Sequence, residues 1–189
     1  MDDLERRLCN ITLAPYIFKA MALVGVRRKA GSNMFRHQIS TLGILLDYKI
    51  IDSVLLKAAV IHDLFEDAPG LPGVSREEIS RLDSDGPAVY ALVMEVTRST
   101  ETKPAFLERI MKSGSPNAKI LKLADRLSNL FALGFVTEED FVRRYLAETR
   151  ELILPYAKQI NPDMYRELSD LVADRERRLL GNDSLQSSR

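Results

Sequence analysis

The chain turns from apolar to acidic within ten residues, 58-AAVIHDLFED-67, and one of its two histidines stands at the turning point. On a helix, residues three or four apart share a face, so His62 would align with Glu66 and Asp63 with Asp67. Burying these carboxylates without compensation would cost several kcal/mol each. A divalent cation removes that cost, and imidazole with carboxylate suits manganese, iron or zinc. The stretch therefore predicts a helix end that carries a metal site.

Two other stretches offer matching groups. His37, the other histidine, lies on the preceding amphipathic segment, and Asp125 interrupts the apolar run 120-ILKLADRL-127. Each feature alone is equally typical of something ordinary: a hydrogen-bonded helix end, a surface or core histidine, or a surface ion pair between Asp125 and Arg126. Their combination on three segments is what favours a shared metal site.

The pattern of the whole chain is helical. Nearly every segment has the helical period, and no alternating runs are joined by a hairpin dipeptide. We therefore predict an all-α fold, a bundle of about eight or nine helices. Asp52 is a good N-cap, and Ser75 with Glu78 has the pattern of a capping box. The expected helices cover about 11–24, a segment from His37 to Leu45, 53–65, 75–82, 85–96, 103–111, a segment from Ser115 that bears Asp125, 137–152 with a bend before Pro155, and 162–180.

Length and composition limit the possible classes. The chain has 189 residues, the size of one domain, with 46% apolar and 29% charged residues. Its formal net charge is zero, so no global basic surface for nucleic acid or an anionic membrane is expected. The single cysteine excludes an intramolecular disulfide and a cysteine-rich zinc site. No apolar run approaches the roughly 18 residues of a membrane span, and the acidic N-terminus does not resemble a signal peptide.

These observations give a simple organisation. We predict one domain over residues 1–180 and a polar, disordered tail over 181–189. We expect a cytoplasmic protein with neither nucleic acid nor a membrane as partner. The sequence leaves the oligomeric state open.

Three blocks carry a resemblance: 28-RKAG-31 leading to His37, 58-AAVIHDLFED-67, and 122-KLADRLSN-129. The order His, then His-Asp, then a distant Asp is the pattern of the HD phosphohydrolase superfamily. The blocks resemble the Arg-Lys-Ser-Gly, Ala-Ala-Leu-Leu-His-Asp-x-x-Glu-Asp and Lys-Leu-Ala-Asp-Arg-Leu-His-Asn motifs of the RelA/SpoT-type alarmone hydrolase domains. The resemblance covers roughly residues 11–135.

The resemblance implies an all-helical HD domain with one divalent metal ion, manganese first among the candidates, held by His37, His62, Asp63 and Asp125. It implies a hydrolase that removes the 3′-pyrophosphate from guanosine 3′,5′-bis(diphosphate) and related alarmones. The expected ligand is therefore a guanosine polyphosphate.

Five further residues receive roles. Glu66 and Asp67 would orient or deprotonate the attacking water. Arg28 and Lys29 would stack on the purine or hold a phosphate, and Asn129 would hydrogen-bond ribose or phosphate. Simpler alternatives stay open: a solvated basic loop for Arg28 and Lys29, a solubilised helix end for Glu66 and Asp67, and, for Asn129, a position behind the metal ligands or on the surface.

Four departures from the related motifs stand near these residues. Ser32-Asn33-Met34 replaces Glu-Pro-Tyr, Gln38 replaces a proline, Ser128 a histidine and Ala132 a threonine. They affect the expected substrate more than the expected metal. Two alternatives therefore remain: a nucleotide phosphohydrolase acting on an adenosine alarmone, NADPH or a nucleoside monophosphate, and a non-catalytic nucleotide-binding module.

Overall fold

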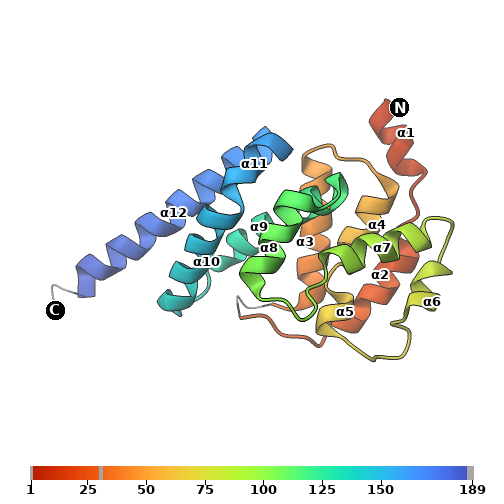
Figure 1. The fold of residues 1–189 in the computed structure, drawn as a ribbon, viewed down its shortest axis with the longest axis horizontal. Coiled ribbons are helices and arrows are strands. Elements are labelled where there is room, and N and C mark those ends of the chain that lie inside the picture. The colour runs from red at the N-terminus through yellow and green to blue at the C-terminus, as the bar shows by residue number, and fades with distance from the viewer. Residues whose placement is uncertain (1, 30–31, 187–189) are drawn as a thin grey trace.

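The computed structural model describes residues 2–29 and 32–186, with side chains described as far as residue 181. Within these ranges the chain is helical and has no β-strand, which confirms the predicted all-α class. The helices are α1 (Asp3–Cys9), α2 (Ala14–Ala20), the short 3-10 helix η1 (Met21–Leu23), α3 (Met34–Asp47), α4 (Ser53–Ile61), α5 (Leu64–Asp67), α6 (Arg76–Ser80), α7 (Gly86–Val96), α8 (Lys103–Ser113), α9 (Pro116–Leu133), α10 (Glu139–Leu152), α11 (Leu154–Ile160) and α12 (Pro162–Gln186) (Figure 1).

Side-chain caps set several helix starts. The Asp52 carboxylate accepts the Leu55 N–H at 2.8 Å, and the Ser75 hydroxyl accepts the Glu78 N–H at 3.3 Å, as the sequence predicts. Asn33 caps α3 by accepting the Arg36 N–H at 2.9 Å. This cap was not expected from the sequence, and it lies within the stretch that departs from the related motifs.

The structure divides the helix predicted over 53–65 into α4 and α5. The expected alignment of His62 with Glu66 on one continuous helix is therefore wrong. The chain leaves α4 after Ile61 and resumes helix at Leu64. A continuous helix would bond the N–H of residue 63 to the carbonyl of residue 59. Instead, the His62 ring nitrogen Nδ1 lies 2.8 Å from the Ala59 carbonyl, and the Asp63 N–H donates to Gln38 Oε1 at 3.4 Å. Side chains thus satisfy the Ala59 carbonyl and the Asp63 N–H, which would bond each other in a continuous helix.

Two other differences explain why more helices are present than the sequence predicts. The helix α1 was not expected, and the bend predicted before Pro155 separates α10 from α11, because proline has no N–H to donate. The last helix continues past residue 180 to Gln186. Gly181 lies within it, and one glycine, which costs about 1 kcal/mol relative to alanine, does not by itself end a helix. Residues 187–189 of the predicted tail lie outside the described residues, and the domain division stays a prediction.

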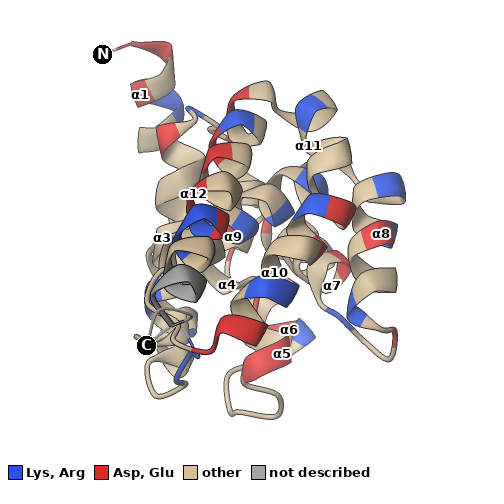
Figure 2. Cartoon of the chain, turned by 90° about the vertical axis from the view of Figure 1, so that its left-hand side faces the viewer, with Lys and Arg blue, Asp and Glu red and all other residues tan. Residues whose placement is uncertain are grey.

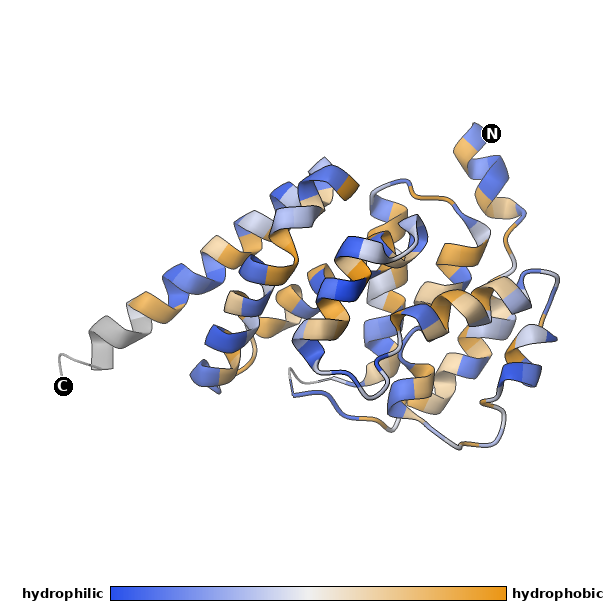
Figure 3. Cartoon of the chain, viewed as in Figure 1, coloured by the Kyte–Doolittle hydropathy of each residue, from blue (hydrophilic) through white to orange (hydrophobic). Residues whose placement is uncertain are grey.

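The core is built around α4 and α9. Every residue from Ala58 to Ile61 is fully buried, so α4 is enclosed on all sides. The helix α9 packs against α3, α4, α7 and α8, and also against α11 and α12. Figure 3 shows apolar residues along the helices of this bundle. No described helix combines the length and the apolar character needed to cross a membrane.

Candidate metal centre

Three helical segments bring the four predicted metal ligands together. His37 comes from α3, His62 and Asp63 from the break between α4 and α5, and Asp125 from α9. His37 Nε2 lies 3.1 Å from Asp125 Oδ1 and 3.4 Å from Asp63 Oδ2. His62 Nε2 lies 3.2 Å from the same oxygen of Asp63 and 3.9 Å from Asp125 Oδ1. Because Asp125 and Arg126 are both buried, the reading of this pair as a solvated surface ion pair is wrong.

Both imidazoles turn Nε2 toward the centre. A carbonyl only accepts hydrogen bonds, so His62 Nδ1 donates to Ala59, and Nε2 is the nitrogen that faces the centre. That Nε2 is buried and has no hydrogen-bond partner among the described residues. His37 Nδ1 lies 2.8 Å from the Ser128 hydroxyl. Bonds of this kind on the outer nitrogen are how proteins orient histidine ligands of metals.

The donor set fits a metal ion. His37, His62 and Asp125 each offer a ligand atom, and these atoms all lie within 4.8 Å of one another. An unpartnered buried nitrogen is costly unless something binds it. The three residues therefore form a group that could hold a metal ion, with Asp63 Oδ2 beside both imidazoles.

The charges at the centre keep its carboxylates ionised. Burial raises the pKa of Asp125, but the Lys122 ammonium at 2.8 Å and His37 outweigh it and hold this pKa well below its ordinary value. Burial also opposes ionisation of Asp63, yet His62 and His37 lower its pKa to about 2. Burial lowers the pKa of His37, and its bonds to Asp125 and Asp63 raise it by more. Two buried negative charges therefore face the two imidazoles.

A cavity of about 310 Å³ opens beside this centre. It is lined by all the predicted site residues except His62, which lies buried behind it. Charges of both signs are spread over the helices of the molecule (Figure 2), but here six Lys and Arg residues gather around the acids. They are Arg28, Lys29, Arg98, Lys103, Lys122 and the buried Arg126. The cavity thus combines an acidic base with a basic rim, an arrangement suited to an anionic ligand beside a cation.

The two predicted catalytic acids lie on α5 and line the cavity. Burial, followed by the charges of Asp63 and Glu66, raises the pKa of Asp67 to about 6. Glu66 accepts the backbone N–H of Arg98 at 3.3 Å, and the Arg98 guanidinium lies 3.6 Å from it. One acid is therefore held by a partner, and the other is poised to exchange a proton near neutral pH.

The predicted substrate residues differ in their surroundings. Arg28 donates to Asn129 Oδ1 at 2.5 Å, and Asn129 Nδ2 donates to Asp125 Oδ1 at 2.6 Å. Asn129 therefore links Arg28 to the centre, so the surface reading of Asn129 is wrong. Lys29 is mostly exposed and lies 5.0 Å from the centre of the Phe141 ring.

Arg28 also borders a second cavity of about 540 Å³. This cavity is lined in addition by Ser32, Arg36, Ser128, Ala132 and Phe135, among others. Three of the positions that depart from the related motifs, Ser32, Ser128 and Ala132, thus face this space.

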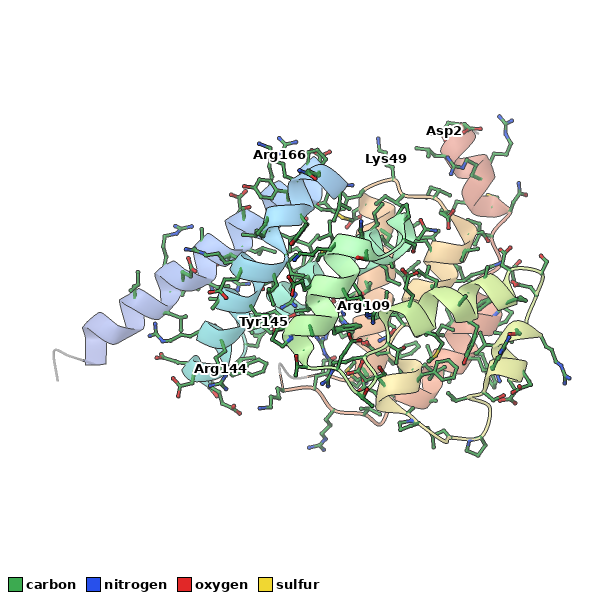
Figure 4. The ribbon with its side chains drawn as sticks, in the orientation of Figure 1. Asp2, Lys49, Arg109, Arg144, Tyr145 and Arg166 are labelled. Carbon is green, nitrogen blue, oxygen red and sulfur yellow. The ribbon has the colours of Figure 1, made fainter. Side chains whose placement is uncertain are left out.

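Among the lining residues of the main cavity that were not predicted are Arg98, Lys103, Phe141 and Tyr145. Tyr145, labelled in Figure 4, belongs to α10, and the ammonium of Lys103 on α8 is 4.9 Å from its ring centre. The only signal in the sequence is the spacing of the two aromatic residues, which places them on one helical face. That spacing equally describes an ordinary core face.

The comparisons place the chain among known proteins. No protein-family model matches it. The GTP pyrophosphokinase rsh of Brucella ovis is 28% identical over 199 residues, covering 91% of this chain and 25% of that protein. The chain thus spans about a quarter of the length of this relative. The guanosine-3′,5′-bis(diphosphate) 3′-pyrophosphohydrolase of Drosophila melanogaster is 35% identical over 130 residues, 66% of each chain. A solved structure, described as a metazoan orthologue of SpoT that hydrolyses ppGpp, matches with a TM-score of 0.73 at 25% identity, covering 86% of this chain and 93% of its own.

Proposed function

Because the chain belongs to the HD-type hydrolase domains related to SpoT, we propose that it removes the 3′-pyrophosphate from guanosine 3′,5′-bis(diphosphate) and related alarmones in a metal-dependent reaction. One observation carries the proposal. Two imidazole nitrogens and two carboxylates converge at the base of a cavity with a cationic rim. The base suits a divalent cation and the rim suits a polyphosphate.

We place the metal at His37, His62, Asp63 and Asp125, with Mn²⁺ as the first candidate. The mixed nitrogen and oxygen donors suit a borderline metal, and the unpartnered Nε2 of His62 supports a ligand at this position. When bound, the ion would neutralise phosphate charge and lower the pKa of water.

We propose that Glu66 and Asp67 carry out the proton transfers of the reaction. A carboxyl whose pKa lies near neutral can take a proton from the attacking water and return it to the leaving group. Asp67, with a pKa of about 6, fits that task best. Arg98 would hold the neighbouring Glu66 in one orientation through its N–H and guanidinium.

The remaining lining residues would bind the nucleotide. Phosphate oxygens would contact the ammonium groups of three lining lysines, Lys29, Lys103 and Lys122. Arg28 lines both cavities, so its planar guanidinium can stack on a purine while the phosphates reach the metal centre. Asn129, already bonded to Arg28, would orient the ribose or a phosphate.

A second candidate keeps the metal and changes the nucleotide. Met34 lines the main cavity where the related motif has tyrosine, and Ala132 lines the second where a threonine hydroxyl is usual. Both changes remove polar or aromatic contacts that could select a guanine. An adenosine alarmone, NADPH or a nucleoside monophosphate is therefore the alternative substrate.

A nucleotide panel with product identification tests these proposals. We expect Mn²⁺-dependent release of pyrophosphate from ppGpp, lost on chelation and restored by Mn²⁺. Arg166→Ala, which changes an exposed residue of α12 (Figure 4), is the matched control and should leave the rate unchanged. Preferred release of phosphate from another nucleotide would favour the second candidate. Tight binding of ppGpp to the metal-loaded protein without turnover would instead indicate a non-catalytic module.

A further inference from the structure

Gln38 is a buried polar residue beside the candidate metal centre that the proposed reaction does not use. It follows His37 on α3, and its side chain is completely buried. Its amide nitrogen Nε2 donates to Asp63 Oδ2 at 2.9 Å, and its amide oxygen Oε1 accepts the Asp63 N–H at 3.4 Å. One side chain therefore holds Asp63 by both its carboxylate and its backbone.

The backbone bond compensates for the break between α4 and α5. His62 Nδ1 occupies the Ala59 carbonyl, so the Asp63 N–H has lost the acceptor that a continuous helix would provide. Gln38 Oε1 supplies another acceptor at this point. A proline at position 38 would offer neither a donor nor an acceptor from its side chain, so this support depends on the residue that this chain carries.

The bond from the Gln38 amide to the Asp63 carboxylate fixes the oxygen that faces both imidazoles. Asp63 Oδ2, which receives the amide of Gln38, is the atom that lies 3.4 Å from His37 Nε2 and 3.2 Å from His62 Nε2. A carboxylate oxygen has more than one lone pair, so it can accept this bond and still bind a cation. The amide therefore selects the rotamer that points Asp63 at the centre without using up its capacity to bind.

We infer that Gln38 is a positioning residue that holds Asp63 in place as a metal ligand. The inference rests on the metal site of the proposed function. Partners of metal ligands at this distance typically contribute about 10- to 100-fold to metal affinity. Gln38 would do so through Asp63 alone, because its amide contacts no other candidate ligand in the described structure.

The test compares Mn²⁺ dissociation constants of the metal-stripped full chain, measured by calorimetry and by electron paramagnetic resonance of free Mn²⁺. Gln38→Met keeps the length of the side chain and removes both polar groups. We expect binding weaker by about 10- to 100-fold. Thr97→Val is the matched control, because Thr97 is partly buried and its hydroxyl bonds the Val93 carbonyl, away from the candidate ligands; it should keep the wild-type affinity.

A double-mutant cycle separates positioning from general packing. In an Asp63→Ala background, Gln38→Met should change the Mn²⁺ dissociation constant less than about twofold. An equal loss in both backgrounds, or wild-type affinity in the Gln38→Met protein, would overturn the inference and leave the proposed function standing. Failure of the wild type itself to bind Mn²⁺ would overturn both. Thermal melts verify folding, and Gln38→Leu replaces the methionine variant if that variant does not fold.

Discussion

Two clusters in this molecule each combine buried charged or titratable side chains with partly exposed acids, and they differ in whether the chain supplies a cation between the acids. Around Lys57, the ammonium nitrogen lies 2.7 Å from Asp83 Oδ2 and 2.7 Å from Asp85 Oδ2, and the Tyr16 hydroxyl donates to Asp83 at 2.8 Å. At the candidate metal centre, two carboxylates instead face the Nε2 atoms of two imidazoles, one of which has no partner among the described residues. We call the first set, Tyr16, Lys57, Asp83 and Asp85, the lysine cluster.

The difference shows how a fold separates structure from chemistry. In the lysine cluster the chain supplies its own cation between two acids, so the charges are compensated without a ligand. It does not line the cavity beside the metal centre. At the metal centre the nearest internal cation, Lys122, contacts Asp125 Oδ2 and leaves Oδ1 to the histidines. Imidazole nitrogen and carboxylate oxygen donors are thus left facing one another, which is the arrangement that a metal ion completes.

Removing a ligand from the metal centre should produce the largest effect. We expect His62→Ala to lower kcat for pyrophosphate release by at least about 1,000-fold, which corresponds to about 4 kcal/mol, because the metal loses a nitrogen ligand. The metal-free variant should also lose some stability, because the buried imidazole bonds the Ala59 carbonyl through Nδ1, but it should stay folded. Steady-state kinetics and thermal melts measure both. A large loss of stability with activity retained would reverse the comparison.

Removing the cation from the lysine cluster should do the opposite. Lys57→Met would leave Asp83 and Asp85 without their ammonium partner, and losing hydrogen bonds to a charged group costs about 1.5–3 kcal/mol where, as here, the acids are partly exposed. Urea unfolding measures this, with Arg166→Met as the control, because loss of an exposed ion pair costs under about 1 kcal/mol. The folded fraction of the Lys57→Met protein should keep the wild-type Mn²⁺ affinity. A lower affinity would mean that the two clusters are coupled.

The sequence allowed the two regions to be predicted very unequally. Each of the three segments that form the metal centre carries a recognisable motif, so its residues could be predicted. The structure brings these residues together, and their roles stay predictions. The lysine cluster joins residues from distant segments, and nothing local marks Lys57 as buried within its apolar run. A lysine there equally fits a side chain that reaches solvent.

The break between α4 and α5 was missed for a related reason. Periodicity describes bonds within one helix, whereas this break depends on a bond from the side chain of Gln38 on α3. The positions of Phe141 and Tyr145 in the cavity were not predicted, because they depend on the packing of α10 against α8. Most helices and the caps at Asp52 and Ser75 depend on local sequence and were predicted, although α1 and the Asn33 cap were not. Contacts between helices could not be predicted in this way.

Neutralising a proposed proton carrier sharpens the assignment within the metal centre. We expect Asp67→Asn to lower kcat by about 100-fold or more while Mn²⁺ affinity changes little, because an amide cannot accept the proton. Single-turnover kinetics and Mn²⁺ titration separate the two quantities. Asp163→Asn, an exposed acid on α12, serves as the control. If metal affinity fell together with kcat, Asp67 would belong with the ligands.

Metal should stabilise only the protein whose centre is intact. At a free Mn²⁺ concentration about 100 times the dissociation constant, binding to the folded state adds about 2.7 kcal/mol to the free energy of unfolding. We expect this gain in the wild type and in Lys57→Met, and none in His62→Ala. Urea unfolding with and without Mn²⁺ measures it. A gain in His62→Ala would place the metal elsewhere.

Lowering the pH should reduce the stabilisation that the lysine cluster contributes, and this effect should be smaller than those above. Burial opposes ionisation of Asp83, but Lys57 and Tyr16 lower its pKa, and Lys57 and Ser53 lower that of Asp85. Their stabilisation is present above the unfolded pKa of about 3.9 and is lost as pH falls through the lower folded values. Burial lowers the pKa of Lys57, but the two acids raise it by more, so its contribution is present below about pH 10 and is lost above the folded pKa. The stability gap between wild type and Lys57→Met should therefore stay constant from about pH 5 to 9 and shrink below about pH 4. Urea unfolding across this range measures the gap, and a gap that widens in acid would show that the acids of the lysine cluster are not held ionised by Lys57.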